Sequence, residues 1–462
     1  MNPLVFRAYD IRGKAEVDFP PEEVKLLGRA LATYFKSRGE KEVIVARDNR
    51  KHSPLLRQSL IEGLIAGGCR VVDIGENPTP VFYFSHHYYG LTAGVMITAS
   101  HNPPEDNGFK ISSGGTTIHG EEIQKIRRLL EQKEFVGGEG YLEEKDPREA
   151  YISSIKERIK LARPLKVAVD AGNGVAGPLA VELLKALGCE VIPLYCEPDS
   201  TYPHHHPDPT IPANLKDLKE VVLAERADVG LALDGDGDRL GVIDEKGNIL
   251  WGDMLQILFW REILPRHPGA PAIVEVKCSQ ALVEEIERLG GRPFFYKTGH
   301  SLIKAKMREI GALFTGEMSG HFFFADEYYG YDDALYAAAR LLRLLSREER
   351  PLSCLLEDVP KYYATPETRI PCPDEQKAEV VAGIVKHFKE RDYEVIDVDG
   401  ARVIFPSGWG LVRASNTQPV LVARCEAKTI GGLKEICAIM QEALLKFPAV
   451  GAFEWEYLTL EN

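Results

Sequence analysis

The stretch EVIVARDNRKHSPLLRQSLIEGLIAGGCRVVDIG (residues 42–75) contains the pattern that decides the fold. EVIVARD at residues 42–48 is a short apolar run rich in β-branched residues, which predicts a buried strand. RQSLIEGLIAGG at residues 57–68 has helical spacing and ends in glycines, a common helix stop signal. CRVVDIG at residues 69–75 predicts the next strand. This order predicts an α/β architecture with a mostly parallel sheet.

The same alternation recurs further along the chain. Each of three units opens with a strand, turns into a helix and later delivers a polar loop directly after another strand. Because ligand-binding loops of open α/β sheets lie at the carboxyl ends of strands, we expect the three loops to meet in one crevice. The units run from VIVARDNR to AGVMITASHNP, from KVAVDAGNG to ADVGLALDGDGDR, and from AIVEVKCS to GALFTGEMSGH.

The chain changes character after about residue 365. ETRIPCPDEQKAEVVAGIVKHF predicts a strand, a loop and a helix, and the residues that follow predict two or three strands and a last helix, GGLKEICAIMQEALLKF. We therefore expect a small separate α+β domain at the C-terminal end. The proline-rich segment EDVPKYYATPETRIPCP is expected to be a hinge or linker.

The composition excludes several classes of function. No run approaches the ~18 apolar residues of a membrane helix, and the N-terminus shows no signal peptide, so we expect a cytoplasmic protein without a membrane partner. A formal net charge of −13 disfavours nucleic acid as a partner. The eight cysteines form no CxxC pair, which predicts reduced thiols in the cores.

The loop Thr98-Ala99-Ser100-His101-Asn102-Pro103 follows the apolar run GVMI. Pro103 and Pro104 prevent the chain from continuing as a strand or helix, so the Ser100 hydroxyl is expected in a rigid turn at a strand end. That is a typical location for a nucleophile. Taken alone, the motif also fits a turn in which polar side chains only satisfy backbone groups.

The loop Asp234-Gly235-Asp236-Gly237-Asp238-Arg239 places three carboxylates at alternate positions. Such carboxylates repel one another unless a cation lies among them, which favours a hard divalent metal. An EF-hand is an alternative because Glu245 stands at the twelfth position, but Arg239 occupies the sixth position, where glycine is required. An acidic hairpin turn is the other alternative, since Asp-Gly is a strong hairpin signal.

Two further loops carry groups suited to a sugar phosphate. In GEMSGH (316–321), Glu317 and Ser319 are separated by one residue, so an extended loop would point both toward neighbouring sugar hydroxyls. RASNT (413–417), with Arg424 on the next strand, offers the donors of a phosphate cradle. The basic residues that accompany the four loops suggest a site for a dianion: Arg12, Lys110, Arg239, Lys277, His300 and Arg413.

These motifs together resemble the α-D-phosphohexomutase family, most closely its phosphomannomutase/phosphoglucomutase branch. The likeness covers essentially the whole chain, and its motifs occur in the family's order. They are FRAYDIRG, TASHNP, HHPDP (205–209), DGDGDR, KTGHS (297–301), GEMSGH and RASNT.

The resemblance implies three related mixed-sheet α/β domains plus a smaller C-terminal α+β domain around a central cleft. The expected domains are residues 1–148, which carry the phosphoserine loop, residues 149–250, which carry the metal loop, and residues 251–364, which carry the sugar-recognition loop. The fourth, residues 365–462, is expected to be a mobile phosphate-binding domain. The resemblance further implies that Ser100 carries a phosphoryl group, and that Mg²⁺ is bound by Asp234, Asp236, Asp238 and an oxygen of that group.

The other site residues follow from the same resemblance. The implied catalytic residues besides Ser100 are Arg12, His101, Lys110 and Arg239, with Lys110 and Arg12 as candidates for assisting proton movement. The implied substrate-binding residues are Tyr9, Lys277, His300, Glu317, Ser319, His321, Arg413, Ser415, Asn416 and Thr417.

Two segments stay outside the predicted site. ARDNRKHSP (46–54) has His52 where the family's R-D-x-R-x-S pattern places serine, with Ser53 next. The run His204-His205-His206 could suggest a metal site, but three consecutive side chains point in different directions, which favours a loop role.

The expected function is the interconversion of hexose 1-phosphate and hexose 6-phosphate, of glucose, mannose or both, through phosphoserine and a hexose 1,6-bisphosphate. Small-molecule hexose phosphates are the expected partners, in a monomer or homodimer. A phosphoglucosamine mutase, a metal-dependent phosphatase and a non-enzymatic sugar-phosphate-binding protein remain alternatives. No loop is dedicated to reading the C2 hydroxyl, so we expect comparable use of glucose and mannose phosphates.

Overall fold

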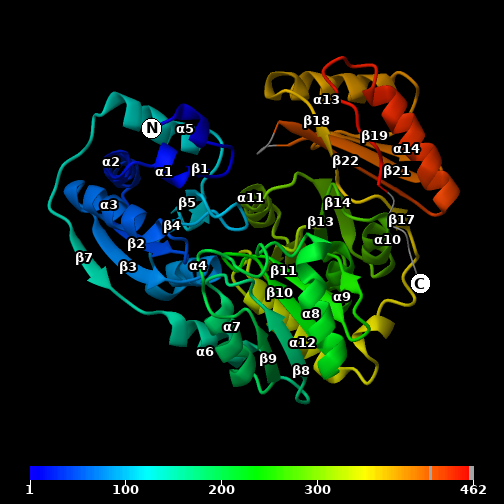
Figure 1. The fold of residues 1–462 in the computed structure, drawn as a ribbon, viewed down its shortest axis with the longest axis horizontal. Helices are drawn as coiled ribbons and strands as arrows, with labels where there is room; N and C mark the ends of the chain where they lie inside the picture. The colour runs from blue at the N-terminus through cyan, green and yellow to red at the C-terminus, as the bar shows by residue number, and fades with distance from the viewer. Residues whose placement is uncertain (416–418, 457–462) are drawn as a thin grey trace.

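The computed structural model describes residues 1–415 and 419–456. Three α/β units follow one another from the N-terminus, coloured blue to yellow in Figure 1, and a fourth unit in orange and red contains the C-terminal sheet. The predicted arrangement of three α/β units and a distinct C-terminal unit is confirmed.

The first unit contains a mixed sheet with strand order β1-β5-β4-β2-β3-β7, and β6 pairs with β5. Strands β4, β2, β3 and β7 are parallel, whereas β5 runs antiparallel to both β4 and β1. The elements are η1 (Pro3–Val5), β1 (Ile11–Lys14), α1 (Ala15–Asp18), α2 (Pro21–Ser37), β2 (Glu42–Arg47), α3 (Ser53–Ala66), β3 (Arg70–Glu76), α4 (Thr79–Tyr89), β4 (Ala93–Ile97), β5 (Asp106–Ser113), β6 (Thr116–Thr117), α5 (Glu121–Gln132) and β7 (Tyr141–Glu144).

Strand β2 explains why the opening stretch is so apolar. Val43 and Val45 belong to a core that also contains residues of α2, α3 and α5. Ile44 and Ala46 belong to the opposite core, with residues of α4. Because side chains of a strand alternate between the two faces of its sheet, a strand covered on both faces needs an unbroken apolar run.

The second unit contains a sheet with strand order β12-β11-β10-β8-β9. Strands β9, β8 and β10 are parallel, and β11 turns back antiparallel to β10, so the predicted strands around the three aspartates are confirmed. The elements are α6 (Arg148–Arg158), β8 (Lys166–Asp170), α7 (Gly177–Ala186), β9 (Glu190–Leu194), η2 (Pro212–Leu215), α8 (Lys216–Glu225), β10 (Val229–Leu233), β11 (Leu240–Asp244) and β12 (Ile249–Leu250).

The third unit has two strand pairs: β13 is parallel to β14, and β15 is antiparallel to β16. The pairs lie side by side, because the Thr315 hydroxyl on β15 donates to the Ile273 carbonyl on β13 at 2.8 Å. The elements are α9 (Gly252–Ile263), η3 (Leu264–Arg266), β13 (Pro271–Glu275), α10 (Gln280–Arg288), β14 (Arg292–Tyr296), α11 (His300–Ile310), β15 (Phe314–Gly316), β16 (Phe322–Phe324), α12 (Ala334–Arg347) and η4 (Leu352–Cys354).

The fourth unit is an antiparallel sheet with order β17-β22-β21-β20-β19, and β18 also pairs with β22. Residues 393–427 form four strands, where two or three were expected, because β19 has only two residues. The elements are β17 (Tyr363–Ala364), β18 (Thr368–Pro371), α13 (Asp374–Lys389), β19 (Val395–Ile396), β20 (Ala401–Phe405), β21 (Gly408–Ala414), β22 (Val420–Ala427) and α14 (Ile430–Leu444).

The proline-rich segment 357–373 differs from the expected hinge or linker. Its residues include β17 and β18, and both strands pair with β22. Pro371 stands at the end of β18, where a missing backbone N–H is tolerated. The segment therefore contributes two short strands to the fourth sheet, and its role as a hinge stays a prediction.

One buried core runs through the first three units, and it includes Phe84 of α4, Tyr151 of α6 and Tyr336 of α12. The fourth unit has a core of its own, to which Ile384 of α13 and Met440 of α14 belong. The first three units are thus packed as one body, whereas the fourth is packed mainly within itself.

Two expectations from composition can be checked directly. All eight cysteines are free and seven are buried, which confirms reduced core thiols. In the parts of the chain that the structure describes, every helix falls short of the length and apolar character needed to span a membrane.

Candidate active site

Ser100 lies in the turn after β4, and its backbone is left-handed, with φ of 52°. Its buried Oγ donates to Asp234 Oδ2 at 2.6 Å. Its amide donates to Thr98 Oγ1 at 2.8 Å, and His101 Nδ1 lies 3.0 Å from its Oγ. A left-handed residue other than glycine costs about 1–2 kcal/mol, so the surroundings must hold this turn. Such strain is concentrated at functional sites.

Arg50 holds the turn, and it is fully buried. Its guanidinium donates to four backbone carbonyls of the loop: those of Ser100 at 2.8 Å, Asn102 at 2.6 Å, Pro103 at 2.6 Å and Asp106 at 2.9 Å. The planar fork of arginine suits such a cradle. Sequence reasoning left Arg50 out of the site.

Asp48 fixes Arg50 in turn. Its Oδ2 lies 3.3 Å from Arg50 Nε, and its Oδ1 accepts the Arg50 amide at 3.0 Å. The Ser53 hydroxyl donates to the same Oδ1 at 2.6 Å, while His52 faces Glu16 at 3.3 Å. The serine one position after His52 therefore contacts the aspartate, and the segment that the sequence analysis excluded supports the nucleophile loop.

The three aspartates between β10 and β11 are fully buried, and one carboxylate oxygen of each lies within 4.8 Å of the others. Asp234 Oδ1 accepts the amides of Asp238 at 3.0 Å and Arg239 at 3.1 Å, which folds the loop around its first carboxylate. Among the described residues, Asp236 Oδ1 and Asp238 Oδ1 have no hydrogen-bond partner. Three buried oxygen ligands, two of them with unused acceptors, fit Mg²⁺.

The neighbours of this loop exclude an EF-hand and show what the hairpin alternative leaves unexplained. Strands flank it on both sides, whereas an EF-hand loop joins helices, and Glu245 accepts the Ser353 hydroxyl rather than turning back to the loop. The hairpin alternative describes the backbone correctly, because β11 turns back beside β10. It does not explain why three carboxylates of that hairpin are fully buried and close together.

Lys110 of β5 supplies positive charge to these carboxylates. Its Nζ lies 2.7 Å from Asp236 Oδ2 and 2.5 Å from Asp238 Oδ2. Burial alone would lower the pKa of Lys110, but the two carboxylates raise it well above its usual value. Burial and the neighbouring Asp238 and Asp236 raise the pKa of Asp234. The pKa of Asp236 is lowered because Lys110 outweighs the effect of burial.

Arg12 and His101 lie beside the nucleophile loop. Arg12 Nη1 donates to Asn102 Oδ1 at 2.8 Å, and its Nη2 pairs with Asp10 at 2.6 Å. Burial and the positive charges of Arg239 and Arg12 lower the pKa of His101 well below its usual value. His101 is therefore neutral, and Arg12 carries the charge at this edge of the site.

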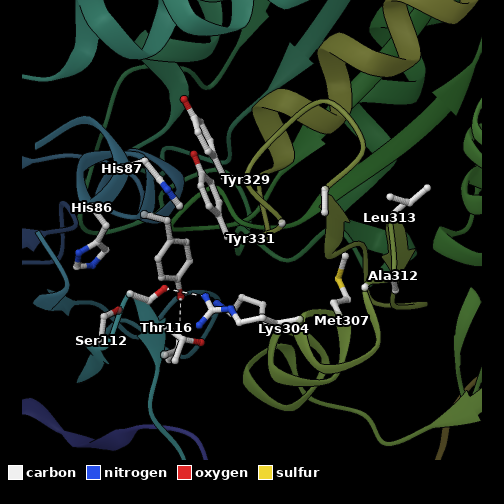
Figure 2. A pocket seen from close by; sticks show the side chains of 17 residues that line it. His86, His87, Ser112, Thr116, Lys304, Met307, Ala312, Leu313, Tyr329 and Tyr331 are labelled. Carbon is white, nitrogen blue, oxygen red and sulfur yellow. Dashed lines mark hydrogen bonds between the residues drawn. The ribbon is translucent and has the colours of Figure 1, made fainter. Parts of the chain in front are cut away.

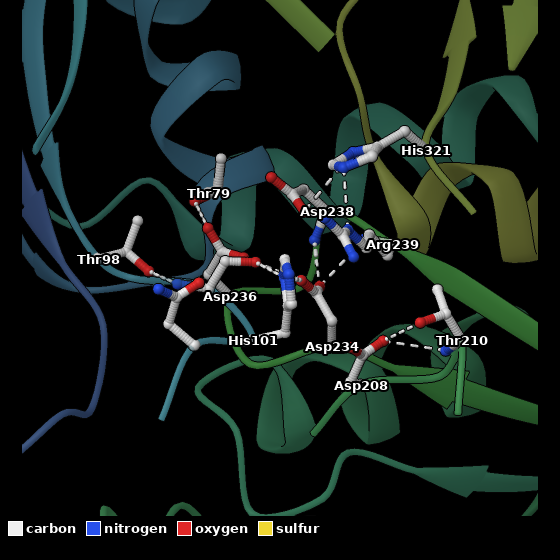
Figure 3. Close-up of polar contacts among 12 residues, drawn as sticks. Thr79, Thr98, His101, Asp208, Thr210, Asp234, Asp236, Asp238, Arg239 and His321 are labelled. Atoms are coloured by element: carbon white, nitrogen blue, oxygen red, sulfur yellow. Dashed lines mark hydrogen bonds and ion pairs between the residues drawn. The ribbon is translucent and has the colours of Figure 1, made fainter. Parts of the chain in front are cut away.

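Figure 3 shows Arg239 and His321 on the far side of the aspartates from Thr98. Arg239 Nε donates to His321 Nε2 at 3.0 Å. The rings of His321 and His300 stack with centroids 5.7 Å apart, so both predicted histidines belong to one group. Thr79, which sequence reasoning missed, donates to Asp236 Oδ2 at 2.6 Å.

The sugar-recognition loop differs from the expected extended form. Residues 317–321 form a tight turn in which the Gly320 amide donates to the Glu317 carbonyl at 3.1 Å. Glu317 is buried and its Oε1 accepts the Gly299 amide at 2.8 Å, whereas Ser319 is half-buried in the turn. The extended loop that would align the two side chains by strand alternation is therefore not formed, because β15 and β16 form a hairpin around them, and their sugar-binding role stays a prediction.

The predicted phosphate clamp lies where the third and fourth units meet. Arg413 donates to Asp399 Oδ2 at 3.0 Å, and the Thr298 amide donates to the same oxygen at 3.0 Å. Tyr9 donates to the Thr298 carbonyl at 3.2 Å. Lys277 pairs with Glu367 at 2.7 Å. Of the other predicted clamp residues, the structure describes Ser415, whereas Asn416 and Thr417 lie outside the described residues.

The histidine run fulfils the loop role expected of it. His204 Nδ1 lies 2.8 Å from Asn173 Oδ1, and His205 Nε2 lies 3.0 Å from Asp170 Oδ2. His206 contacts the backbone carbonyl of His101. The three side chains have three different partners.

The structure therefore brings the predicted residues together in two linked groups. One surrounds Ser100 and the aspartates, and the other surrounds Arg413 and Lys277. The segment 298–300 links them, because Thr298 contacts the clamp, Gly299 contacts Glu317, and His300 stacks on His321.

Comparison with known proteins agrees with this arrangement. Four consecutive models of phosphoglucomutase/phosphomannomutase match the chain: alpha/beta/alpha domain I at residues 3–137, domain II at 149–247, domain III at 251–363 and the C-terminal domain at 367–443. The chain belongs to the phosphoglucomutase/phosphomannomutase family. The resemblance inferred from the motifs is confirmed.

Individual members of the phosphoglucomutase/phosphomannomutase family are similar over nearly the whole chain. A phosphomannomutase/phosphoglucomutase of Pseudomonas aeruginosa is 46% identical and covers 95% of each chain. A probable phosphoglucosamine mutase of Methanopyrus kandleri is 37% identical and covers 93% of this chain and 95% of its own. The crystal structure of a family protein from Burkholderia thailandensis has a TM-score of 0.91 at 42% identity, covering 98% of this chain and 99% of that one.

Proposed function

We propose that this protein is a phosphohexomutase that interconverts hexose 1-phosphate and hexose 6-phosphate, with glucose and mannose as the sugars. The observation that carries the proposal is the placement of Ser100. Its hydroxyl stands in a strained turn, 2.6 Å from the first of three buried carboxylates. The name of the Pseudomonas aeruginosa relative supports the same reaction.

In the proposed cycle, phosphorylated Ser100 donates its phosphoryl group to the free hydroxyl of a hexose monophosphate. The bond between phosphorus and Ser100 Oγ breaks, a bond between phosphorus and the sugar oxygen forms, and the proton of the sugar hydroxyl ends on Ser100 Oγ. The resulting hexose 1,6-bisphosphate turns around in the site. Its other phosphoryl group then returns to Ser100 by the same bond exchange in reverse.

Charge stabilisation dominates catalysis of this kind. Mg²⁺, held by Asp234, Asp236, Asp238 and an oxygen of the phosphorylated serine, would neutralise charge on the transferring group. Lys110 pairs with two of these carboxylates, and the Arg239 side chain contacts His321 beside them. We assign both to the equatorial phosphoryl oxygens.

Arg12 and Lys110 were also candidates for moving the hydroxyl proton. The ion pairs of Lys110 with two carboxylates favour its protonated form, and an arginine side chain can only donate, so we assign Lys110 and Arg12 as hydrogen-bond donors and charge stabilisers. Arg12 also donates to Asn102, which aligns it with the serine loop.

Arg413, Lys277, Tyr9 and the segment 415–417 are proposed to hold the phosphate that is not being transferred. A bisphosphate that turns around presents either end to this clamp. We propose that the fourth unit moves with respect to the others to allow the exchange and closes again to exclude water. Without that exclusion, water would take the phosphoryl group and the enzyme would act as a phosphatase.

Glu317 and Ser319 are proposed to bind the O3 and O4 hydroxyls of the sugar. The hydrogen bond from the Gly299 amide holds the Glu317 carboxylate in a fixed orientation. Glucose and mannose share the configuration at both hydroxyls and differ at C2. Strong discrimination needs a buried polar group left unpaired by the wrong substrate, so comparable use of both sugars is expected.

The test is an isomerisation assay with added hexose 1,6-bisphosphate on the 1-phosphates of glucose, mannose, glucosamine and galactose. Comparable turnover of glucose and mannose phosphates, with galactose phosphate much poorer, would support the proposal. A preference beyond ~100-fold between glucose and mannose would mean that C2 is read. A preference for glucosamine phosphate would favour the phosphoglucosamine mutase alternative, release of inorganic phosphate would favour a phosphatase, and binding without turnover would favour a regulator.

A further inference from the structure

Asp332 is a fully buried carboxylate in the loop between β16 and α12, behind the candidate active site. Its Oδ1 pairs with Lys304 Nζ at 2.8 Å. Its Oδ2 lies 3.2 Å from His321 Nδ1 and 3.3 Å from His300 Nδ1. Among the described residues, these two nitrogens and Asp332 Oδ2 are buried atoms without a hydrogen bond of good geometry, so these close contacts are the ones they have with each other. One carboxylate thus faces a lysine on one side and two active-site histidines on the other.

The contact between Arg239 and His321 determines where the His321 proton lies. Arginine Nε–H can only donate, and it points at His321 Nε2 from 3.0 Å. His321 Nε2 must therefore present its lone pair, and the ring proton must be on Nδ1. That nitrogen faces Asp332 Oδ2, whereas Asp238 Oδ1 is more distant, at 3.6 Å, and beyond good hydrogen-bond range.

The consequence reaches Arg239. Its Nε–H donates to the His321 ring, so only its two terminal nitrogens are available to donate to a phosphoryl group. A guanidinium gripped at Nε has a fixed plane, and the direction of its terminal N–H groups is fixed with it. His321 can hold Arg239 in this way only while a carboxylate oxygen stabilises the proton on Nδ1.

We propose that Asp332 is a positioning residue of the phosphoryl-transfer site: it fixes His321 in the Nδ1-protonated tautomer, and His321 in turn anchors Arg239. The inference rests on the proposed phosphohexomutase function and adds a residue to that site. His300 Nδ1 faces the same carboxylate oxygen, so Asp332 also orients the His300 ring.

A structural ion pair with Lys304 is the competing explanation. Lys304 lines a cavity of about 300 Å³ between the first and third units, together with Tyr331 and Met307 (Figure 2). The cavity contains none of the proposed catalytic residues. If Asp332 served only to pair with Lys304, then removing either partner would have the same effect, because both changes break the same ion pair.

Asp332→Asn separates the two explanations. Asparagine has one oxygen and one NH₂ group, and the Lys304 ammonium, which can only donate, takes the oxygen. The NH₂ group then faces His321 Nδ1, so the ring proton moves to Nε2 and opposes the Arg239 Nε–H. We expect kcat to fall about 10–100-fold, the usual effect of losing an outer-shell partner of this kind, with KM little changed.

The double variant Lys304→Met/Asp332→Asn is the decisive measurement. Without the ammonium, the asparagine oxygen is free to turn toward the histidines, and the tautomer is restored. Methionine has a similar length, and the adjoining cavity accommodates its end. We expect the double variant to be more active than Asp332→Asn alone, although it carries one more change in the core.

Asp333→Asn is the matched control. Asp333 is the neighbouring buried carboxylate; it caps α12 by accepting the Tyr336 amide at 2.8 Å and accepts the Tyr151 hydroxyl at 2.9 Å. The structure gives it no contact with either histidine in the described residues. Asparagine is a good helix cap, so we expect kcat close to that of the unchanged enzyme.

Histidine-selective nitrogen NMR reads the tautomer directly, with His321→Gln identifying the signal. We expect Nδ1 protonated in the unchanged enzyme and in the double variant, and Nε2 protonated in Asp332→Asn. An unchanged tautomer in Asp332→Asn, or a double variant no more active than the single one, would overturn the proposal. If the unchanged protein has no mutase activity, the proposed function fails, while the tautomer measurement still tests Asp332.

Discussion

Replacing Arg50 with lysine tests whether the strained turn at Ser100 matters for transfer. Arg50 donates to four carbonyls spread over residues 100–106, at 2.6–2.9 Å. A lysine keeps the charge near Asp48 but offers its donors from a single nitrogen, so we expect it to keep about two of the four bonds. The backbone of the serine loop then loses part of its support while the charge is unchanged.

The size of the effect follows from these contacts. Hydrogen bonds to a charged group are worth ~1.5–3 kcal/mol each, so losing two costs about 3–6 kcal/mol of local stability. The left-handed turn itself costs about 1–2 kcal/mol, so the loss is enough to let Ser100 relax. A displacement of the hydroxyl by ~1 Å lowers turnover about 100-fold.

Arg340→Lys is the matched control for general destabilisation. Arg340 is also fully buried, and it also donates four hydrogen bonds, to Glu262 and Asp326, away from the site. Turnover of glucose 1-phosphate, phosphorylation of Ser100 by bisphosphate and the midpoint of urea unfolding are measured for both variants. We expect similar shifts of the midpoint and a loss of turnover and phosphorylation in Arg50→Lys alone. Equal turnover in the two variants would refute the reasoning.

Three further variants test the chemistry. Ser100→Ala is expected to keep the circular dichroism of the folded protein and to lose nearly all turnover; wild-type-like turnover would exclude the phosphoserine mechanism. Asp236→Asn is expected to weaken Mg²⁺ binding measured by calorimetry and to slow transfer, and normal activity of chelator-treated enzyme would contradict the metal assignment. Arg413→Ala is expected to raise KM and the release of bisphosphate, because a charge-assisted contact of ~1.5–3 kcal/mol is lost; unchanged retention of bisphosphate would remove the clamp role.

The order of elements could be predicted from the sequence where one run of residues decides its own structure. The β2–α3–β3 segment is an example, because alternate residues of β2 enter two cores and the whole strand must be apolar. Strands β17 and β19 were harder to recognise. Each has two residues, and pairing with a neighbouring strand defines them rather than their own pattern.

The chemical loops could also be predicted, because each gathers unusual side chains within six residues. Their supporting residues could not. Thr79 lies 157 residues from Asp236, and Arg50 lies 50 residues from Ser100. A buried threonine or arginine leaves no local signal of its distant partner. Asp332 precedes Asp333, and only Asp333 carries a recognisable signal, the cap of a helix.

The division of the core supports the proposal that one site holds a substrate that turns around. Ser100 and the aspartates belong to units that share one continuous core, so transfer takes place in a rigid frame. Arg413 belongs to a unit with its own core, which meets the third unit through a small apolar cluster of Val276, Trp409 and Leu411. Buried arginines also join the two units: Arg402 donates to the Val276 and Cys278 carbonyls, and Arg424 donates to the Lys277 carbonyl. In the proposed opening these contacts would break, while the core shared by the first three units stays packed. We therefore propose that the phosphoryl-transfer end stays fixed while the end that accepts either phosphate moves.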